Sequence, residues 1–413
     1  MSNPTGLVHG WVSAVCGRGT IDILWSCLVT TILCVWTAIH LPVPHYELDW
    51  PLSMRKEIVR SKIVPALIFI IAPEMLTYTA IVEFLSAWKT TEALKSLLPN
   101  ENISLVHGFF LEMGGFCFKF EGDKYRQIEV DDIADLLGIS PQLIERKERV
   151  ESRLTRRKNT HDNMESIARD TQMQWAEELG KVSKDQINET ANSDALTKLI
   201  TVGQVSWFGT QVVSRLVQHR AVTLLEVSTS AYVFYALAAY LAWCKKPQGS
   251  QIPLIISSTE KTAAPERMTS YSRVQGTWRE FLWGGIDWFE PVDKDIPPWH
   301  IALLTLLPTA YGAFYVASWN ITLPSKVELW LWRGSGLYCM AFGLSVGLLF
   351  AIDRPLDKSP KAALKLSRYL TVGTIALYTM VRLCMGVEVL ISLRALPHSA
   401  YDSIQWSTFV PHI

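Results

Sequence analysis

Long apolar runs constrain this chain more than any other feature of its sequence. A helix of about 20 apolar residues crosses the roughly 30 Å hydrocarbon core of a bilayer. Runs that meet or approach this length occupy residues 21–42, 196–218, 222–243, 299–318, 330–352 and 366–393. In lipid, such a run satisfies its backbone hydrogen bonds internally only as a helix. We therefore expect an all-α fold, a polytopic transmembrane helical bundle.

Two further apolar segments raise the expected number of spans to about six to eight. Residues 63–87 are apolar but contain two glutamates and two prolines, among them Glu74 and Pro73. Residues 105–118 are too short for a straight span. Together they predict a broken or re-entrant element that lines a cavity, because proline interrupts a helix. In that case Glu74 and His107 face protein or water, not lipid.

Composition narrows the class of protein further. Hydrophobic residues make up 49% of the chain and charged residues only 19%. The net charge is zero, so nucleic acid is not an expected partner, whereas membrane lipids are. The seven cysteines show no spacing typical of a zinc site, and we expect neither a metal nor a cofactor. No cleavable signal peptide precedes the first run, which must itself direct membrane insertion.

Basic residues in the links predict the orientation of the spans. They gather at 55–62, 245–246 and 354–368, which should be cytoplasmic. Both termini then lie on the other side, with the turns at 219–221 and 319–329. The second turn contains Asn320 in an Asn-Ile-Thr sequon, so we expect a multi-pass glycoprotein of the endoplasmic reticulum or another endomembrane.

The hydropathy pattern divides the chain into five stretches. They are an N-terminal membrane segment at 1–118, a polar cytoplasmic helical segment at 119–195, a transmembrane hairpin at 196–243, an irregular cytoplasmic loop at 244–298 and a C-terminal membrane segment at 299–413. Within the polar insertion we expect short helices, one opening at Ser140-Pro141 and another over 183–195. The basic stretch 145–158 fits an amphipathic helix on anionic lipid as well as a solvated helix.

The polar insertion also contains an acidic motif, DDIAD at 131–135. Its spacing matches the aspartate motif of magnesium-dependent prenyl chemistry. Acidic residues are also common at the start of a helix, and no second metal motif accompanies this one. We therefore interpret 131–135 as a helix start without a metal.

Ionisable residues inside the apolar runs indicate where chemistry could occur. A charge in a bilayer costs several kcal/mol, so such residues usually face the bundle interior and have partners. The candidate catalytic residues are Glu74, His107, Glu226 and Glu388. The candidate substrate-binding residues are Arg215, Arg382 and Gln211. Each has a structural interpretation by itself, but together they predict a polar pocket within the membrane.

Two of these residues are expected to pair. Arg215 and Glu226 flank the turn at 219–221 at similar depth on antiparallel neighbours, so a hydrogen bond or a one-water bridge could join them. Arg382 and Glu388 are six residues apart, which places them on different faces of one helix. One of the two should therefore complete the polar cluster.

Several strings in the sequence resemble a family of fungal multi-pass membrane proteins that is largely uncharacterised. They are GRGT and IDILWSC at 17–27, HGFF at 107–110, MGGF at 113–116, SDAL at 193–196, QVSWF at 204–208, and Trp406, Phe409 and Pro411-His412-Ile413. Some members resemble products of fungal secondary-metabolite gene clusters. The resemblance implies a membrane protein but no particular activity, and the charged 145–158 stretch departs from it.

Three functions fit these features. The first is a metal-independent acid–base enzyme, of cyclase or isomerase type, acting on a lipophilic intermediate of fungal secondary metabolism. The second is a small-molecule transporter that uses the same polar residues, although the chain shows no inverted repeat. The third is a non-catalytic scaffold that holds soluble biosynthetic enzymes at the cytoplasmic face through 119–195.

The charge pattern makes a prediction about the ends of the chain. Tags on both termini should be protected from protease in sealed microsomes and digested once detergent opens them, because the basic links hold the other side in the cytoplasm. Digestion of either tag in sealed vesicles would refute this topology. A tag inserted in the link at 354–360 serves as the accessible control.

Overall fold

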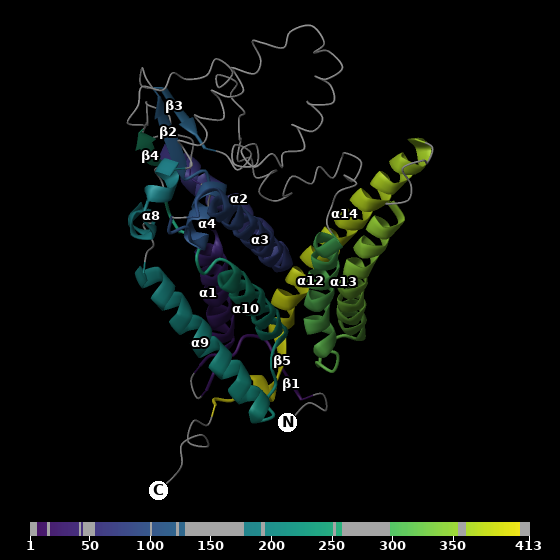
Figure 1. Ribbon diagram of the computed structural model, residues 1–413. Helices are drawn as coiled ribbons and strands as arrows, with labels where there is room; N and C mark the ends of the chain where they lie inside the picture. Colours follow the sequence, from purple (N-terminus) through teal and green to yellow (C-terminus); the bar gives the residue numbers. More distant parts are fainter. Residues whose placement is uncertain are drawn as a thin grey trace.

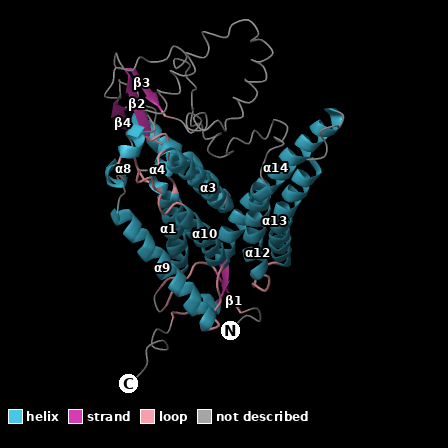
Figure 2. Cartoon of the chain, in the orientation of Figure 1, coloured by secondary structure: helices cyan, strands magenta, loops and turns pink. Residues whose placement is uncertain are grey.

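The structure is a computed structural model that describes residues 6–14, 17–40, 43, 54–99, 101–120, 124–128, 177–190, 195–250, 253–257, 298–353 and 361–404. It is mainly helical, with long helices inclined to one another and small strands at the two ends (Figures 1 and 2). The acidic motif at 131–135 and the basic stretch 145–158 lie outside the described residues.

Most helices coincide with the apolar runs, and α8 lies in the polar insertion. The helices are α1 (Thr20–Ala38), α2 (Met54–Ile71), α3 (Pro73–Leu97), α4 (Leu105–Glu112), α8 (Lys184–Thr190), α9 (Ala195–Val217), α10 (Leu224–Ala242), α12 (Pro298–Ala317), α13 (Lys326–Asp353) and α14 (Lys361–Ile391). Two short 3-10 turns, η3 (Ser392–Arg394) and η4 (His398–Ala400), follow α14. The expected short helix within 183–195 is confirmed as α8.

Four of these helices are long and apolar enough to cross a membrane: α1, α10, α12 and the Val372–Arg394 part of the last helix. The α2–α3 pair raises the number to five if it forms one bent span. A bundle of six to eight spans is therefore not confirmed among the described residues. α9 is the more polar of the remaining long helices, since it carries Gln204, Gln211 and Arg215.

The break between α2 and α3 confirms the expected interruption. The two helices bend by 118° at Ala72. Pro73 is the first residue of α3, where its missing N–H costs nothing, and its ring would obstruct a continuing α2. Glu74 and His107 are 2% and 0% exposed, so both face protein as expected.

The all-α expectation is wrong at two small sheets. One contains β2 (Phe116–Phe120), flanked by the antiparallel β3 (Lys124–Gln127) and the parallel β4 (Leu254–Ser257). Consequently 105–118 is not half a span, since α4 ends and Gly114, at a φ of 71°, turns the chain into β2. The loop at 244–298 is likewise not wholly irregular. Alternating or β-branched apolar residues favour these strands, but runs this short are easily missed.

Two groups of helices make up the bundle (Figure 1). In one, α1 packs against α9 and α10, and α10 against α3; in the other, α12, α13 and α14 pack side by side. The α12–α13 contact is close because it uses glycine. A Cβ on Gly312 would lie 2.3 Å from the backbone nitrogen of Met340, and one on Gly343 would lie 2.3 Å from the carbonyl oxygen of Thr305.

A buried polar group holds the first helical group together near the end of α10. Lys246 Nζ lies 2.5 Å from a carboxylate oxygen of Glu83, which also accepts from the Trp243 indole at 2.7 Å. His40 follows α1 and packs against Trp243, with the two rings tilted and their centres 5.0 Å apart. Burial, together with the nearby Lys246 charge, lowers the pKa of His40 to about 3, which keeps this imidazole neutral.

The two ends of the described chain meet. β1 (Leu7–His9) pairs antiparallel with β5 (Ala395–Pro397), with Val8 opposite Leu396. The turns after α9 and after α12 lie at this same end (Figure 1). Asn320 and Thr322 are exposed there, so the sequon is sterically accessible. The side of the membrane on which this end lies stays a prediction.

The β1–β5 pairing predicts a crosslink between distant parts of the chain. Val8→Cys combined with Leu396→Cys should form a disulfide under mild oxidation, because directly paired strand residues bring Cβ atoms within about 5.5 Å. Peptide mass spectrometry would detect it. Val8→Cys with Trp330→Cys on the exposed face of α13 is the control and should not crosslink. Equal crosslinking in both pairs would contradict the register.

Candidate functional site

A buried polar cluster lies where α2 and α3 break. We call it the helix-break cluster, and it consists of Glu74, Tyr311, Tyr315, Tyr378 and Arg382. α3, α12 and α14 contribute these side chains, and all five are less than 9% exposed. The structure thus brings together two of the residues that the sequence singled out, Glu74 and Arg382, and surrounds them with tyrosines.

Arg382 satisfies the open end of α2. Its Nε donates to the carbonyl oxygen of Ile71 at 2.8 Å, and its Nη2 donates to the same oxygen. Nη1 lies 3.2 Å from the Tyr315 hydroxyl, and the guanidinium sits 3.8 Å from the centre of the Tyr311 ring. The last carbonyls of a helix have no intrahelical donor and carry partial negative charge, so a cation is stabilised there.

Glu74 lies in the first turn of α3, where the helix dipole favours a negative charge. Tyr378 donates to its Oε1 at 2.5 Å. Its other oxygen, Oε2, is buried and has no hydrogen-bond partner among the described residues. Phe342 stacks on Tyr378 with ring centres 4.0 Å apart, which fixes the hydroxyl that holds the carboxyl group.

The geometry of the helix-break cluster suits proton transfer. A carboxyl group with one free oxygen can give or take a proton there, while the hydrogen bond at the other oxygen stabilises the anion. The neighbouring Tyr311 and Tyr315, whose hydroxyls are hydrogen-bonded to each other, present aromatic faces in the same interior. Such faces stabilise a nearby positive charge.

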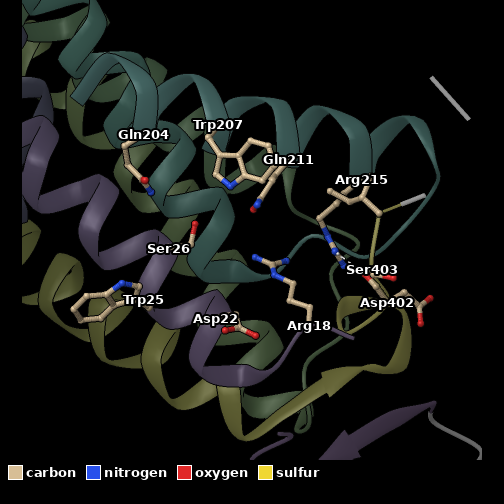
Figure 3. Close-up of a pocket in the computed structure, with 11 residues that line it drawn as sticks. Arg18, Asp22, Trp25, Ser26, Gln204, Trp207, Gln211, Arg215, Asp402 and Ser403 are labelled. Carbon is tan, nitrogen blue, oxygen red and sulfur yellow. Dashed lines mark hydrogen bonds between the residues drawn. The ribbon is translucent and has the colours of Figure 1, made fainter. Parts of the chain in front are cut away.

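A second feature is a cavity of about 480 Å³ between α1 and α9 (Figure 3). We call it the α1–α9 cavity. Its lining residues are Arg18, Asp22, Trp25, Ser26, Gln204, Trp207, Gln211, Arg215, Asp402, Ser403 and Ile404. Two sequence-derived candidates, Gln211 and Arg215, therefore belong to this cavity, at a different place from the helix-break cluster.

Glu226 does not form the predicted direct pair with Arg215. Its Oε1 lies 2.6 Å from Nη1 of Arg18, and its Oε2 accepts from the backbone N–H and hydroxyl of Thr223 at 2.8 and 3.0 Å. The second set of contacts is a capping box at the start of α10. Glu226 therefore has a structural role. The sequence could not predict this role, because Arg18 is far from Glu226 along the chain and close to it only in the folded protein.

Arg215 instead fastens the turn after α9 to the C-terminal segment. Its guanidinium donates to the carbonyl oxygens of Ala221 at 3.1 Å, Ser399 at 2.8 Å, Ala400 at 2.8 Å and Asp402 at 3.2 Å. These carbonyl oxygens come from two chain segments that lie far apart in the sequence. The side chain therefore has a positioning role, while its edge contributes to the cavity wall.

The other candidates lie apart from both features. His107 has both ring nitrogens engaged, Nδ1 with Ser104 at 2.9 Å and Nε2 with the carbonyl oxygen of Val182 at 2.8 Å. Glu388 is partly buried on α14 and interacts electrostatically with Glu328. Arg382 does join a buried polar cluster, as expected of either Arg382 or Glu388. That cluster contains Glu74, however, and not Arg215 and Glu226.

Sequence reasoning missed Arg18 and the tyrosines. Tyr311 and Tyr315 are four residues apart, so they share one helix face, and this spacing could have drawn attention to them. Nothing in the sequence near Arg18 indicates that it meets Glu226. Only the folded arrangement of α1 and α10, which pack side by side, brings the pair together.

The fold and the two polar features define a class: a mainly helical protein with several membrane-competent helices and ionisable groups buried between them. The chain belongs to a family of unknown function, DUF8562, whose pattern matches residues 2–100, 165–276 and 299–413. No curated protein and no solved structure matches the chain. A family of unknown function is consistent with the resemblance to a largely uncharacterised family.

The Arg18–Glu226 pair makes a prediction about stability. Arg18→Gln and Glu226→Gln should each destabilise the purified protein by about 3 kcal/mol, since each leaves a buried charge without its partner. The double variant should lose much less than the sum of the two. Thermal unfolding in detergent would measure this. Arg18→Gln combined with Glu83→Gln is the control pair, in which the losses should nearly add, because Glu83 pairs with Lys246 and not with Arg18. Additive losses in the Arg18–Glu226 cycle would contradict the pair.

Proposed function

We propose that this protein is an integral membrane enzyme that carries out acid–base chemistry, of cyclase or isomerase type, on a lipophilic small molecule. The observation that carries the proposal is the Glu74 carboxyl group. It is buried in an aromatic interior, held at one oxygen by Tyr378, free at the other and close to Arg382. The fungal resemblance supports a secondary metabolite as the substrate and an endomembrane as the location.

The proposed reaction starts with a proton on Oε2 of Glu74. The proton passes to an alkene, epoxide or carbonyl of the substrate; a new C–H or O–H bond forms and the carboxyl O–H bond breaks. The electron pair stays on the carboxylate, which Tyr378 and Arg382 stabilise. The substrate cation forms beside the Glu74 carboxylate, which balances its charge. Loss of a proton from another substrate atom to Glu74 then regenerates the acid.

This scheme reassigns the residues that the sequence suggested. Glu74 is the acid and base, and Arg382 stabilises its ionised form. His107 and Glu226 hold the fold through the contacts described above. Glu388 serves as the comparison carboxyl group. Because the proposed proton leaves and returns to one carboxyl group, substrate and product have the same molecular formula.

A transporter is the second candidate, and the helix break favours it. Discontinuous membrane helices place two helix ends in the bundle interior, where many secondary transporters bind their substrates. Here the end of α2 accepts hydrogen bonds from Arg382 of α14, and the start of α3 carries Glu74. The scaffold hypothesis instead depends on 119–195, most of which lies outside the described residues.

Replacement of Glu74 tests the enzyme proposal. Cells that express Glu74→Gln in place of the natural chain should accumulate a lipophilic compound and lose an isomer of the same formula, because the amide cannot donate the proton. Mass spectrometry with chromatographic separation would detect this. Glu388→Gln removes another carboxyl group with an unpartnered oxygen and should leave both compounds unchanged.

Three other outcomes of this experiment would overturn the enzyme proposal. With protein abundance verified, an unchanged isomer ratio in Glu74→Gln refutes it. A normal product that stays on one side of the membrane supports the transporter instead. A loss of both isomers together with mislocalised soluble enzymes supports the scaffold.

A further inference from the structure

The α1–α9 cavity contains hydrogen-bond donors that the fold does not use. The Ser26 hydroxyl oxygen is buried and has no partner among the described residues. Arg18 uses Nη1 for its ion pair with Glu226, and among the described residues its Nε and Nη2 have no hydrogen-bond partner. In Figure 3 the Arg18 guanidinium points into the space between Ser26 and the amide of Gln211. Three donor-bearing side chains therefore converge on one point.

The walls around this point are amphipathic. Trp207 of α9 lies directly beside the converging side chains, with its indole above the Arg18 guanidinium in Figure 3. Trp25 of α1 and Trp207 are 70% and 51% exposed, so their outer faces are available to lipid. Tryptophan favours the boundary between polar and apolar surroundings. A ligand here would have a polar head at the donors and an apolar tail between the two helices.

The charges of the cavity limit the head. Glu226 balances Arg18, while Arg220 is within 3.0 Å of a carboxylate oxygen of Asp402. Arg215 is held by carbonyl oxygens, not by a carboxylate, and Asp22 receives a hydrogen bond from the Gly19 N–H at 2.8 Å. Three positive and three negative charges therefore balance within and beside the cavity. Because the cavity has no excess positive charge, a head with one negative charge costs less to bring in than a head with two.

We propose that the α1–α9 cavity binds a long-chain carboxylate, with its carboxylate group at Arg18, Ser26 and Gln211 and its chain between Trp25 and Trp207. A guanidinium matches a carboxylate in shape and charge, and all three polar side chains can donate to an acceptor-only group. The site is separate from Glu74 and goes beyond the proposed function, so either can fail without the other.

Photolabelling of the full-length protein tests the proposal. Purified protein in detergent is mixed with a long-chain fatty acid that carries a diazirine in its tail, irradiated and digested. We expect labelled peptides from α1 and α9, and competition by unmodified fatty acid but not by its methyl ester. Ser26→Phe places a ring in the space beside the Arg18 guanidinium and removes one donor, so it should reduce labelling about tenfold, as expected when a charged hydrogen bond is lost.

Control variants keep the result interpretable. Ser206→Phe adds the same ring to the exposed face of α9 and should label like the natural protein. Gln211→Leu removes one donor with little change of volume and should weaken labelling if Ser26→Phe fails to fold. Glu74→Gln should label normally. Undiminished labelling in Ser26→Phe or in Gln211→Leu, equal competition by the methyl ester, or competition by an anionic phospholipid alone would each overturn the carboxylate site.

Discussion

The carbonyl oxygen of Ile71 sets the central constraint of this structure. A helix that stops inside an apolar bundle leaves acceptors that water cannot reach, and each costs several kcal/mol if nothing donates to it. Arg382 supplies the donors, and its charge lies against the faces of the tyrosine rings, with Glu74 across the break. If α2 continued through position 73, the Ile71 carbonyl oxygen would accept a hydrogen bond within the helix. Arg382 would then not be needed as its donor, and the tyrosine rings would not be needed around a buried charge.

Two polar centres follow from this arrangement instead of the one pocket that the sequence suggested. α10 connects them. Its first turn carries Glu226, which meets Arg18, and further along Tyr235 donates to the carbonyl oxygen of Leu307 beside the helix-break cluster. Since one helix contacts both centres, a shift of α10 would move side chains in both. Binding of a ligand in the α1–α9 cavity could therefore change the surroundings of Glu74 through α10.

The hydropathy pattern predicted most helices, because apolar run length is a strong local signal. The break at Pro73 and the burial of Glu74 and His107 were also predictable, since proline and buried charge have local consequences. Partners were not. Arg215 and Glu226 are close in sequence, yet Arg215 binds the segment near Ser399 and Glu226 binds Arg18. Which distant residues pair depends on how the helices pack. The number of residues between two side chains does not determine that packing.

The pairing of β1 with β5 has a consequence for the order in which the protein is made. The partners Leu7 and Pro397 stand at opposite extremes of the described chain, so the strand contact forms only after the last helix has been synthesised. Contacts with such long sequence separation form late because their loop must close first. Until then, the segment at Leu7–His9 has an open edge, which is a site where chaperones or neighbouring chains can bind. Biogenesis therefore includes a late closure step, in which the end of translation completes the structure around the beginning.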